Sequence, residues 1–518
     1  MTLIRAAGLI GGLTLVSRIL GFAREMIMAR VLGAGLAADA FNLAFKLPNV
    51  FRRLFAEGAF ASAFVPLFSR QKAEGGLAAA KRFAEEVLAV LVPALLLLTA
   101  LAEMFMPAAV WLLNGGGCFA GVPGKLDLAV SLSRVTFPYL LFISLTALLG
   151  GILNSLSRFA ASAAAPVLLN IVLIAALVAA EGGEVLTARW LAWGVAAAGL
   201  LQFLWLWLAC RRAGVRLRLR LPRLTPGVKR FFAMVGPAAL GAGVYQVSQL
   251  IDLFFASRLP QGSLSYLNYA DRLNQLPLGV VGIALGTALL PALAAHIAKG
   301  EEAEAVRIQN RAAEMALFLS LPAAAALMVL AHPLVTALYM AGRFGAGDAA
   351  ATAAVLAGLA AGLPAYVLVK VLTPAFFARG DTATPVKTAL AALALNVALI
   401  LLFIAPYGVA GLAWATAASA WFNCALLYAM LRRAGAFRFD SVFARRVLAA
   451  SAATVLMAAA LALLLNTAGL RFDGGTLERV GAVLTAVGVG ALVYFTAAAL
   501  FGAMPLRELK ARLRRGGN

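Results

Sequence analysis

Arginines lie in the middle of the first two apolar segments of this 518-residue chain. Segment 8–33 contains Arg18 and Arg24, although it is long enough to cross a bilayer, which takes about 20 apolar residues. Segment 39–66 contains a second cluster of charges. An arginine at the centre of a lipid-facing helix costs about 2.5–3.5 kcal/mol on insertion scales. Such residues are kept where they face a wet cavity or bind an anion, so the pattern predicts a cationic cavity inside a membrane protein.

The composition predicts an all-α polytopic membrane protein. Hydrophobic residues make up 63% of the chain and charged residues 13%, and the mean hydropathy is +0.93. A net charge of +22 would suggest nucleic acid in a soluble protein, but here the basic residues gather in alternate connections between apolar segments. This asymmetry predicts that both termini are cytoplasmic and that nucleic acid is not a partner. The three cysteines are far apart, and neither a metal motif nor a P-loop is visible.

Fourteen segments are predicted to span the membrane. They are 8–33, 39–66, 83–112, 128–155, 162–181, 189–210, 230–257, 264–297, 306–331, 348–377, 385–405, 408–431, 445–466 and 477–502.

A weak internal repeat divides these segments. At an offset of 226 residues, Asn42 and Lys46 align with Asn268 and Arg272. An offset of six helices preserves orientation, so it predicts two six-helix lobes related by a pseudo-two-fold axis along the membrane normal, followed by two C-terminal helices. The predicted parts are an N-lobe at 1–212, a basic cytoplasmic linker at 213–229, a C-lobe at 230–434, and two last helices with a basic tail at 435–518.

Polar side chains share faces of the first two spans. Ser17 and Arg24 lie on one face of the first span, and Arg18 points elsewhere. Arg24 either lines a cavity, or pairs with Glu25 or Asp39 and supports packing.

The second span contains a proline, Pro48, among its charges. The polar residues around this proline are Asp39, Lys46, Asn49, Arg52, Arg53 and Glu57. Pro48 removes one backbone hydrogen bond and can bend the helix, so the segment is either a moving gate or a static kink whose charges snorkel or pair.

The span 264–297 corresponds to the second span in the repeat and has its own polar stripe, which includes Ser265 and Arg272. Guanidinium groups form two parallel hydrogen bonds to phosphate oxygens. A site built from Arg18, Arg24, Arg52 and Arg272 would therefore suit a diphosphate.

Other polar residues within spans have two readings each. Arg134 and Lys370 are either partners of helix ends or functional groups. Asn170 and Asn396 are expected to form interhelical hydrogen bonds, and Asp252 with Asn396 is the candidate site for a small cation.

Several blocks of the chain resemble the MurJ (MviN) lipid II flippases of the multidrug/oligosaccharidyl-lipid/polysaccharide exporter superfamily. The blocks are SRILGFAR at 17–24, ADAF at 38–41, FKLPN at 45–49, RRLFAEGAF at 52–60, YADRL at 269–273 and GTALLP at 286–291.

The resemblance implies fourteen helices in two lobes in a bacterial inner membrane. It implies that lipid II, the undecaprenyl-diphosphate-linked peptidoglycan precursor, is carried to the periplasmic leaflet by alternating access. The resemblance also implies that Arg18, Arg24, Arg52 and Arg272 match cavity arginines of the family, and that Asp39 and Lys370 match further charged positions. The last two helices would form a groove for the lipid tail. Membrane lipids and cell-wall synthesis proteins are the expected partners of a monomer, which needs no cofactor but depends on membrane potential or a monovalent cation.

Three alternatives remain from the residues themselves. One is an exporter of drugs or of another lipid-linked oligosaccharide on the same fold, although a basic cavity disfavours cationic drugs. Another is a membrane-embedded glycosyltransferase, which would want catalytic carboxylates and a larger loop domain. The last is a structural scaffold, which leaves the arginines within spans without a role.

Overall fold

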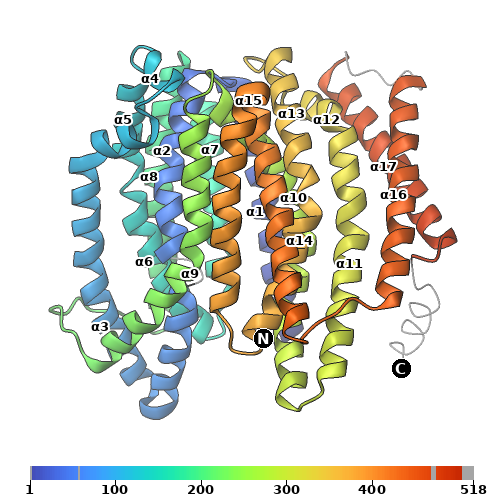
Figure 1. The fold of residues 1–518 in the computed structure, drawn as a ribbon. Coiled ribbons are helices and arrows are strands. Elements are labelled where there is room, and N and C mark those ends of the chain that lie inside the picture. Colours follow the sequence, from blue (N-terminus) through green and yellow to red (C-terminus); the bar gives the residue numbers. More distant parts are fainter. Residues whose placement is uncertain (1–2, 56–58, 468–473, 504–518) are drawn as a thin grey trace. The chain divides into compact units, whose positions relative to one another are not determined.

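The computed structural model describes residues 3–55, 59–467 and 474–503, and these residues form helices without any strand (Figure 1). The helices are α1 (Leu3–Leu32), α2 (Leu36–Phe55), α3 (Ala59–Asn114), α4 (Cys118–Gly121), α5 (Lys125–Thr136), α6 (Tyr139–Ser155), α7 (Phe159–Ala179), α8 (Glu184–Arg212), α9 (Pro226–Ala256), α10 (Ser263–Ala298), α11 (Glu302–Val329), α12 (Ala331–Tyr339), α13 (Ala346–Ala361), α14 (Leu363–Phe377), α15 (Ala383–Arg433), α16 (Ser441–Thr467) and α17 (Thr476–Leu500).

Most predicted spans coincide with these helices to within a few residues. Glycines make the sharp turns inside the two longest helices. α3 turns at Gly75 and Gly76, and α15 turns at Gly408, whose φ is 54°. A positive φ suits glycine because it has no Cβ to clash with the backbone. The turn at Gly408 separates the predicted spans 385–405 and 408–431.

Among the described residues, nine segments are long and apolar enough to cross a membrane. Helices α1, α2, α9 and α10 are not among them, because they carry charges or include side chains outside the described set. The helical multi-pass membrane fold is thus confirmed, and the total of fourteen spans stays a prediction. The short helices α4 and α12 were not predicted.

Contacts group the chain into two compact units. The first comprises 1–265 with 341–344, and the second comprises 266–340 with 345–518. In the first unit, α3 packs against α6 and α9 around a cluster of phenylalanines. In the second unit, α11 packs against α14 and α16. The predicted lobes and linker were drawn from the repeat rather than from contacts, and they stay a prediction.

At two prolines inside helices, a neighbouring helix bonds the main-chain carbonyl that the proline leaves without a donor. A proline has no N–H for the carbonyl four residues earlier. Pro48 of α2 thus frees the Ala44 carbonyl, which accepts a hydrogen bond of 2.8 Å from Thr136 Oγ1 of α5. Pro322 of α11 frees the Phe318 carbonyl, which accepts one of 2.6 Å from the Tyr494 hydroxyl of α17. These bonds replace water, which a bilayer core does not supply.

We expect Thr136→Val to lower the free energy of unfolding by about 0.6–2 kcal/mol, because it leaves the Ala44 carbonyl without this donor. In a Pro48→Ala background the restored N–H takes that carbonyl, so the same substitution should have a smaller effect. Unfolding in detergent titrated with a denaturing surfactant measures both values, and the difference is the coupling energy.

The matched control is Thr146→Val. Thr146 is buried and bonds the Phe142 carbonyl of its own helix α6, where no proline interrupts the ladder. Equal effects of Thr136→Val with and without Pro48 would contradict the proposed role of Thr136.

Candidate functional site

Arg24 of α1 is buried within the first unit and held from two directions. Its Nη2 lies 2.5 Å from Glu25 Oε1, and its Nη1 donates a hydrogen bond of 3.1 Å to Asn170 Oδ1 of α7. Its guanidinium also lies 5.8 Å from the centroid of the Phe45 ring of α2. A buried charge needs such partners because its desolvation is costly. Of the two partners predicted for Arg24, Glu25 is therefore the one observed here.

Asn170 also joins α7 to α1. Its Nδ2 donates to the Ser17 carbonyl at 2.9 Å and lies 3.5 Å from Ser17 Oγ. Gly21 lies between Ser17 and Arg24 on α1, and a Cβ there would be 3.5 Å from Asn170 Nδ2. The small residue lets the amide lie close to the helix backbone. The predicted interhelical role of Asn170 is confirmed.

Arg52 is half-buried on α2, one turn beyond Pro48. Its Nε donates to Asn49 Oδ1 at 3.0 Å, and Asn49 Nδ2 donates to the Phe45 carbonyl at 2.8 Å. Arg52 and Arg24 both exert an electrostatic effect on the buried hydroxyl of Tyr139. The structure thus places these two predicted arginines near one buried side chain, Tyr139.

Asp39 lies at a separate place, near the start of α2, with 1% of its surface exposed. Its Oδ2 lies 2.8 Å from Lys125 Nζ and accepts from the Gly262 N–H at 2.8 Å. Its Oδ1 accepts from the Ser265 N–H at 3.1 Å and from Ser265 Oγ at 2.7 Å. The ring of Phe119 covers the Lys125 ammonium at 4.4 Å. Asp39 therefore ties the beginnings of α2, α5 and α10 together and accepts from four donor groups of three residues.

The other predicted residues of the first unit are more dispersed. Arg18 is exposed on α1, and Lys46 is half-buried on α2. The backbone of Arg53 belongs to α2, but its side chain lies outside the described set, and Glu57 lies outside the described residues altogether.

Two of the predicted basic site residues belong to the second unit. Arg272 of α10 and Lys370 of α14 are both half-buried. One residue before Arg272, the Asp271 carboxylate accepts a hydrogen bond from Gln275 Nε2.

The candidate site for a small cation consists of Asp252 and Asn396. Asp252 is half-buried on α9, and Asn396 is buried on α15. In the part of the chain that the structure describes, no group of three His, Cys, Asp or Glu is arranged to hold a metal. The pair stays a prediction.

Lys125 is the residue that sequence reasoning missed. Its place between the predicted spans 83–112 and 128–155 indicates a solvated connection, yet only 2% of its side chain is exposed and it pairs with Asp39. The available signal was Asp39 itself, because a carboxylate within a span needs a cation or several donors.

Solved structures share this fold. One is a lipid II flippase MurJ in an inward closed conformation, with a TM-score of 0.79 and 24% identity over 95% of this chain and 98% of that chain. Another is an inward-facing multidrug resistance transporter of the MATE family, with a TM-score of 0.65 and 16% identity over 81% and 94%. The fold is that of a class of multi-pass membrane transporters.

Sequence comparisons are more specific. The family model described as lipid II flippase MurJ matches residues 28–477. A probable lipid II flippase MurJ of Rhizobium tropici is 43% identical over 99% of this chain and 97% of its own. The counterpart of Vibrio cholerae is 36% identical over 98% of both. The chain belongs to the lipid II flippase MurJ family.

The buried pair of Asp39 and Lys125 makes a stability prediction. Lys125→Met should lower the free energy of unfolding by about 3–5 kcal/mol, because it leaves a buried carboxylate without its cation. Adding Asp39→Asn removes the second charge and should recover part of that loss. Thermal unfolding in detergent measures both. The control is Lys72→Met, at an exposed lysine of α3; equal stability of the two lysine variants would rule out a stabilising pair.

Proposed function

We propose that this protein is a flippase that moves lipid II from the cytoplasmic to the periplasmic leaflet of a bacterial inner membrane, for peptidoglycan synthesis. The observation that carries the proposal is the family match over residues 28–477, together with relatives of full length that bear the same name. The proposed activity is transport, and the cargo leaves chemically unchanged.

The chemistry of the arginines supports an anionic head group. Arg24 and Arg52 lie among polar partners rather than in lipid, and guanidinium groups bind phosphate oxygens in a bidentate manner. In this structure the Glu25 carboxylate occupies one edge of Arg24. A diphosphate would therefore have to displace Glu25 from that edge, and its added negative charge would need further cations such as Arg52. The contribution of Arg272 and the rocking of two lobes stay predictions from sequence.

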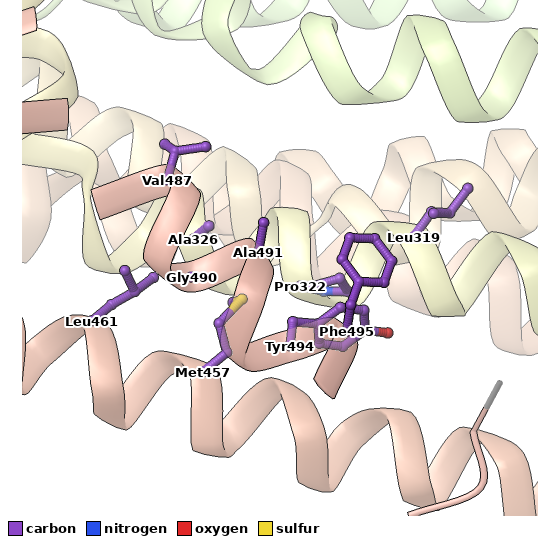
Figure 2. Close-up of a pocket in the computed structure, with 10 residues that line it drawn as sticks. All are labelled: Leu319, Pro322, Ala326, Met457, Leu461, Val487, Gly490, Ala491, Tyr494 and Phe495. Atoms are coloured by element: carbon purple, nitrogen blue, oxygen red, sulfur yellow. The ribbon is translucent and has the colours of Figure 1, made fainter. Parts of the chain in front are cut away.

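An apolar pocket in the second unit supports a place for part of the lipid tail. It has a volume of about 170 Å³ and lies among α11, α16 and α17. Figure 2 shows Met457 and Leu461 of α16 on one side of it, with Val487 and Ala491 of α17 beside them. The lining is almost entirely apolar, and the Tyr494 hydroxyl within it is bonded to the Phe318 carbonyl, so the pocket would accept a hydrocarbon chain and not the head group.

The remaining expectations belong to the same proposal. Both termini would be cytoplasmic, as the distribution of Lys and Arg indicates. The protein would act as a monomer beside cell-wall synthesis proteins. Membrane potential would bias the step, since moving one elementary charge across 100 mV is worth about 2.3 kcal/mol.

Replacing Arg24 should abolish flipping. We expect Arg24→Ala to insert into the membrane but to fail in a strain depleted of its own flippase, because the head group loses a buried fork of donors. Arg24→Lys should fail as well, since one ammonium does not bond in two fixed directions. The control is Arg158→Ala, at an exposed arginine preceding α7. Full complementation by Arg24→Ala and Arg272→Ala would refute the head-group role.

Cargo identity is tested separately, with purified protein in vesicles. Leaflet exchange of lipid II is measured beside exchange of an undecaprenyl-linked O-antigen unit. Exchange of lipid II alone is expected. Equal rates would indicate a general exporter of lipid-linked oligosaccharides, and exchange of the O-antigen unit alone would refute lipid II as the cargo.

Filling the apolar pocket should slow flipping without affecting insertion. Ala491→Trp places a large ring in the pocket and should reduce leaflet exchange severalfold, because the tail loses its space. Leu484→Trp lies on the same helix α17, is 65% exposed and does not line the pocket. We expect it to flip lipid II normally, and equal rates for the two variants would contradict a role of the pocket.

A further inference from the structure

Two arginines outside the Arg24 cluster line a pocket on the first unit. Arg134 of α5 and Arg189 of α8 border a space of about 320 Å³ together with Ser131 and Trp193. All four are exposed, and the Trp193 side chain is 64% exposed although it lies within a segment apolar enough to span the membrane. The proposed head-group site uses none of these residues.

The local bonding leaves both guanidinium groups with unused donors. Arg134 Nε donates to the Glu103 carbonyl of α3 at 3.3 Å. Pro107 frees that carbonyl, so Arg134 bonds a carbonyl inside helix α3 and not one at a helix end, which was one of the two predicted roles. Its Nη groups have no hydrogen-bond partner among the described residues, and Arg189 has neither an ion pair nor a side-chain hydrogen bond with them.

Arg134 and Arg189 lie at positions along their helices that correspond to the edge of the hydrocarbon layer. Helix α8 has 29 residues, or about 43 Å at about 1.5 Å per residue, against a hydrocarbon core of about 30 Å. Arg189 is in the second turn of α8 and Arg134 is in the third turn of α5. The distribution of charges in the sequence puts the beginnings of both helices on the external side. Exposed Arg and Trp side chains at this depth lie where lipid phosphates are.

The charged groups around the pocket have a net charge of one positive unit. The Glu103 carboxylate is near enough to interact electrostatically with Arg134, although the two form no ion pair within 4 Å in the described structure. Two guanidinium groups and one carboxylate sum to a single positive charge. One phosphodiester would neutralise it, whereas an unneutralised arginine facing lipid would be costly.

We infer that this pocket binds the phosphate of an anionic phospholipid of the outer leaflet. The phosphate oxygens accept hydrogen bonds from Arg134 Nη and from Arg189. The acyl chains lie along the exposed apolar surface that includes Trp193. The lipid is a resident ligand of the first unit and is distinct from the transported cargo.

The test counts phosphatidylglycerol on the purified protein in detergent by native mass spectrometry. We expect the first phosphatidylglycerol to dissociate at a concentration about tenfold higher for Arg134→Gln or Arg189→Gln than for the unmodified protein. Arg158→Gln removes an exposed arginine elsewhere in the same unit and should bind as the unmodified protein does. Equal affinity in all four proteins would overturn the inference.

A second variant keeps both arginines in place. Ser131→Glu puts a carboxylate into the pocket and should weaken phosphatidylglycerol binding by a similar factor, even if the arginine variants unfold. Undiminished binding by Ser131→Glu would count against the site. Phosphatidylcholine should bind more weakly than phosphatidylglycerol, and millimolar inorganic phosphate should not displace the lipid; equal binding of the two lipids, or displacement by phosphate, would also overturn the inference.

Discussion

A polar group within the membrane is costly unless something bonds or neutralises it, and this constraint organises many of the described helices. Prolines show it most directly, because each removes a donor from the helix ladder. The carbonyls of Ala44, Glu103 and Phe318 all lie four residues before a proline, and each accepts a hydrogen bond from a side chain of another helix. Since the donors have fixed positions, each bond also sets the register between two helices.

The same constraint separates the arginines into two groups. Arg24 is buried and its guanidinium is occupied by Glu25 and Asn170, so its charge is compensated in the protein. Arg134 and Arg189 are exposed at a depth where their compensation must come from outside. A single rule, that charge in a membrane is neutralised nearby, thus underlies both proposals, the internal site for the cargo head group and the external site for a resident lipid.

The sequence predicted the helices well and their connections less well. Apolar length located most helices, including the break between the spans 385–405 and 408–431, because this signal is local. Partners of charges were harder to predict. Glu25 was named as a partner of Arg24 because the two are adjacent, but the pairing of Asp39 with Lys125 joins residues 86 positions apart. A count of basic residues by connection treats every lysine alike, so it gave no sign that Lys125 is buried.

The proline kinks bear on how a transporter of this kind moves. The sequence alone identifies which carbonyls need a donor, because each lies four residues before a proline. Which side chain supplies the donor depends on the packing of the helices. Once the donor is known, it limits where a helix bends. The bond from Thr136 to Ala44 ties α2 at Pro48 to α5 in the same contact unit. Arg52 follows Pro48 by one turn, so its position is coupled to α5 as long as this bond holds. A change of conformation that keeps the bond would move this arginine and α5 together, as the proposed rocking of lobes requires.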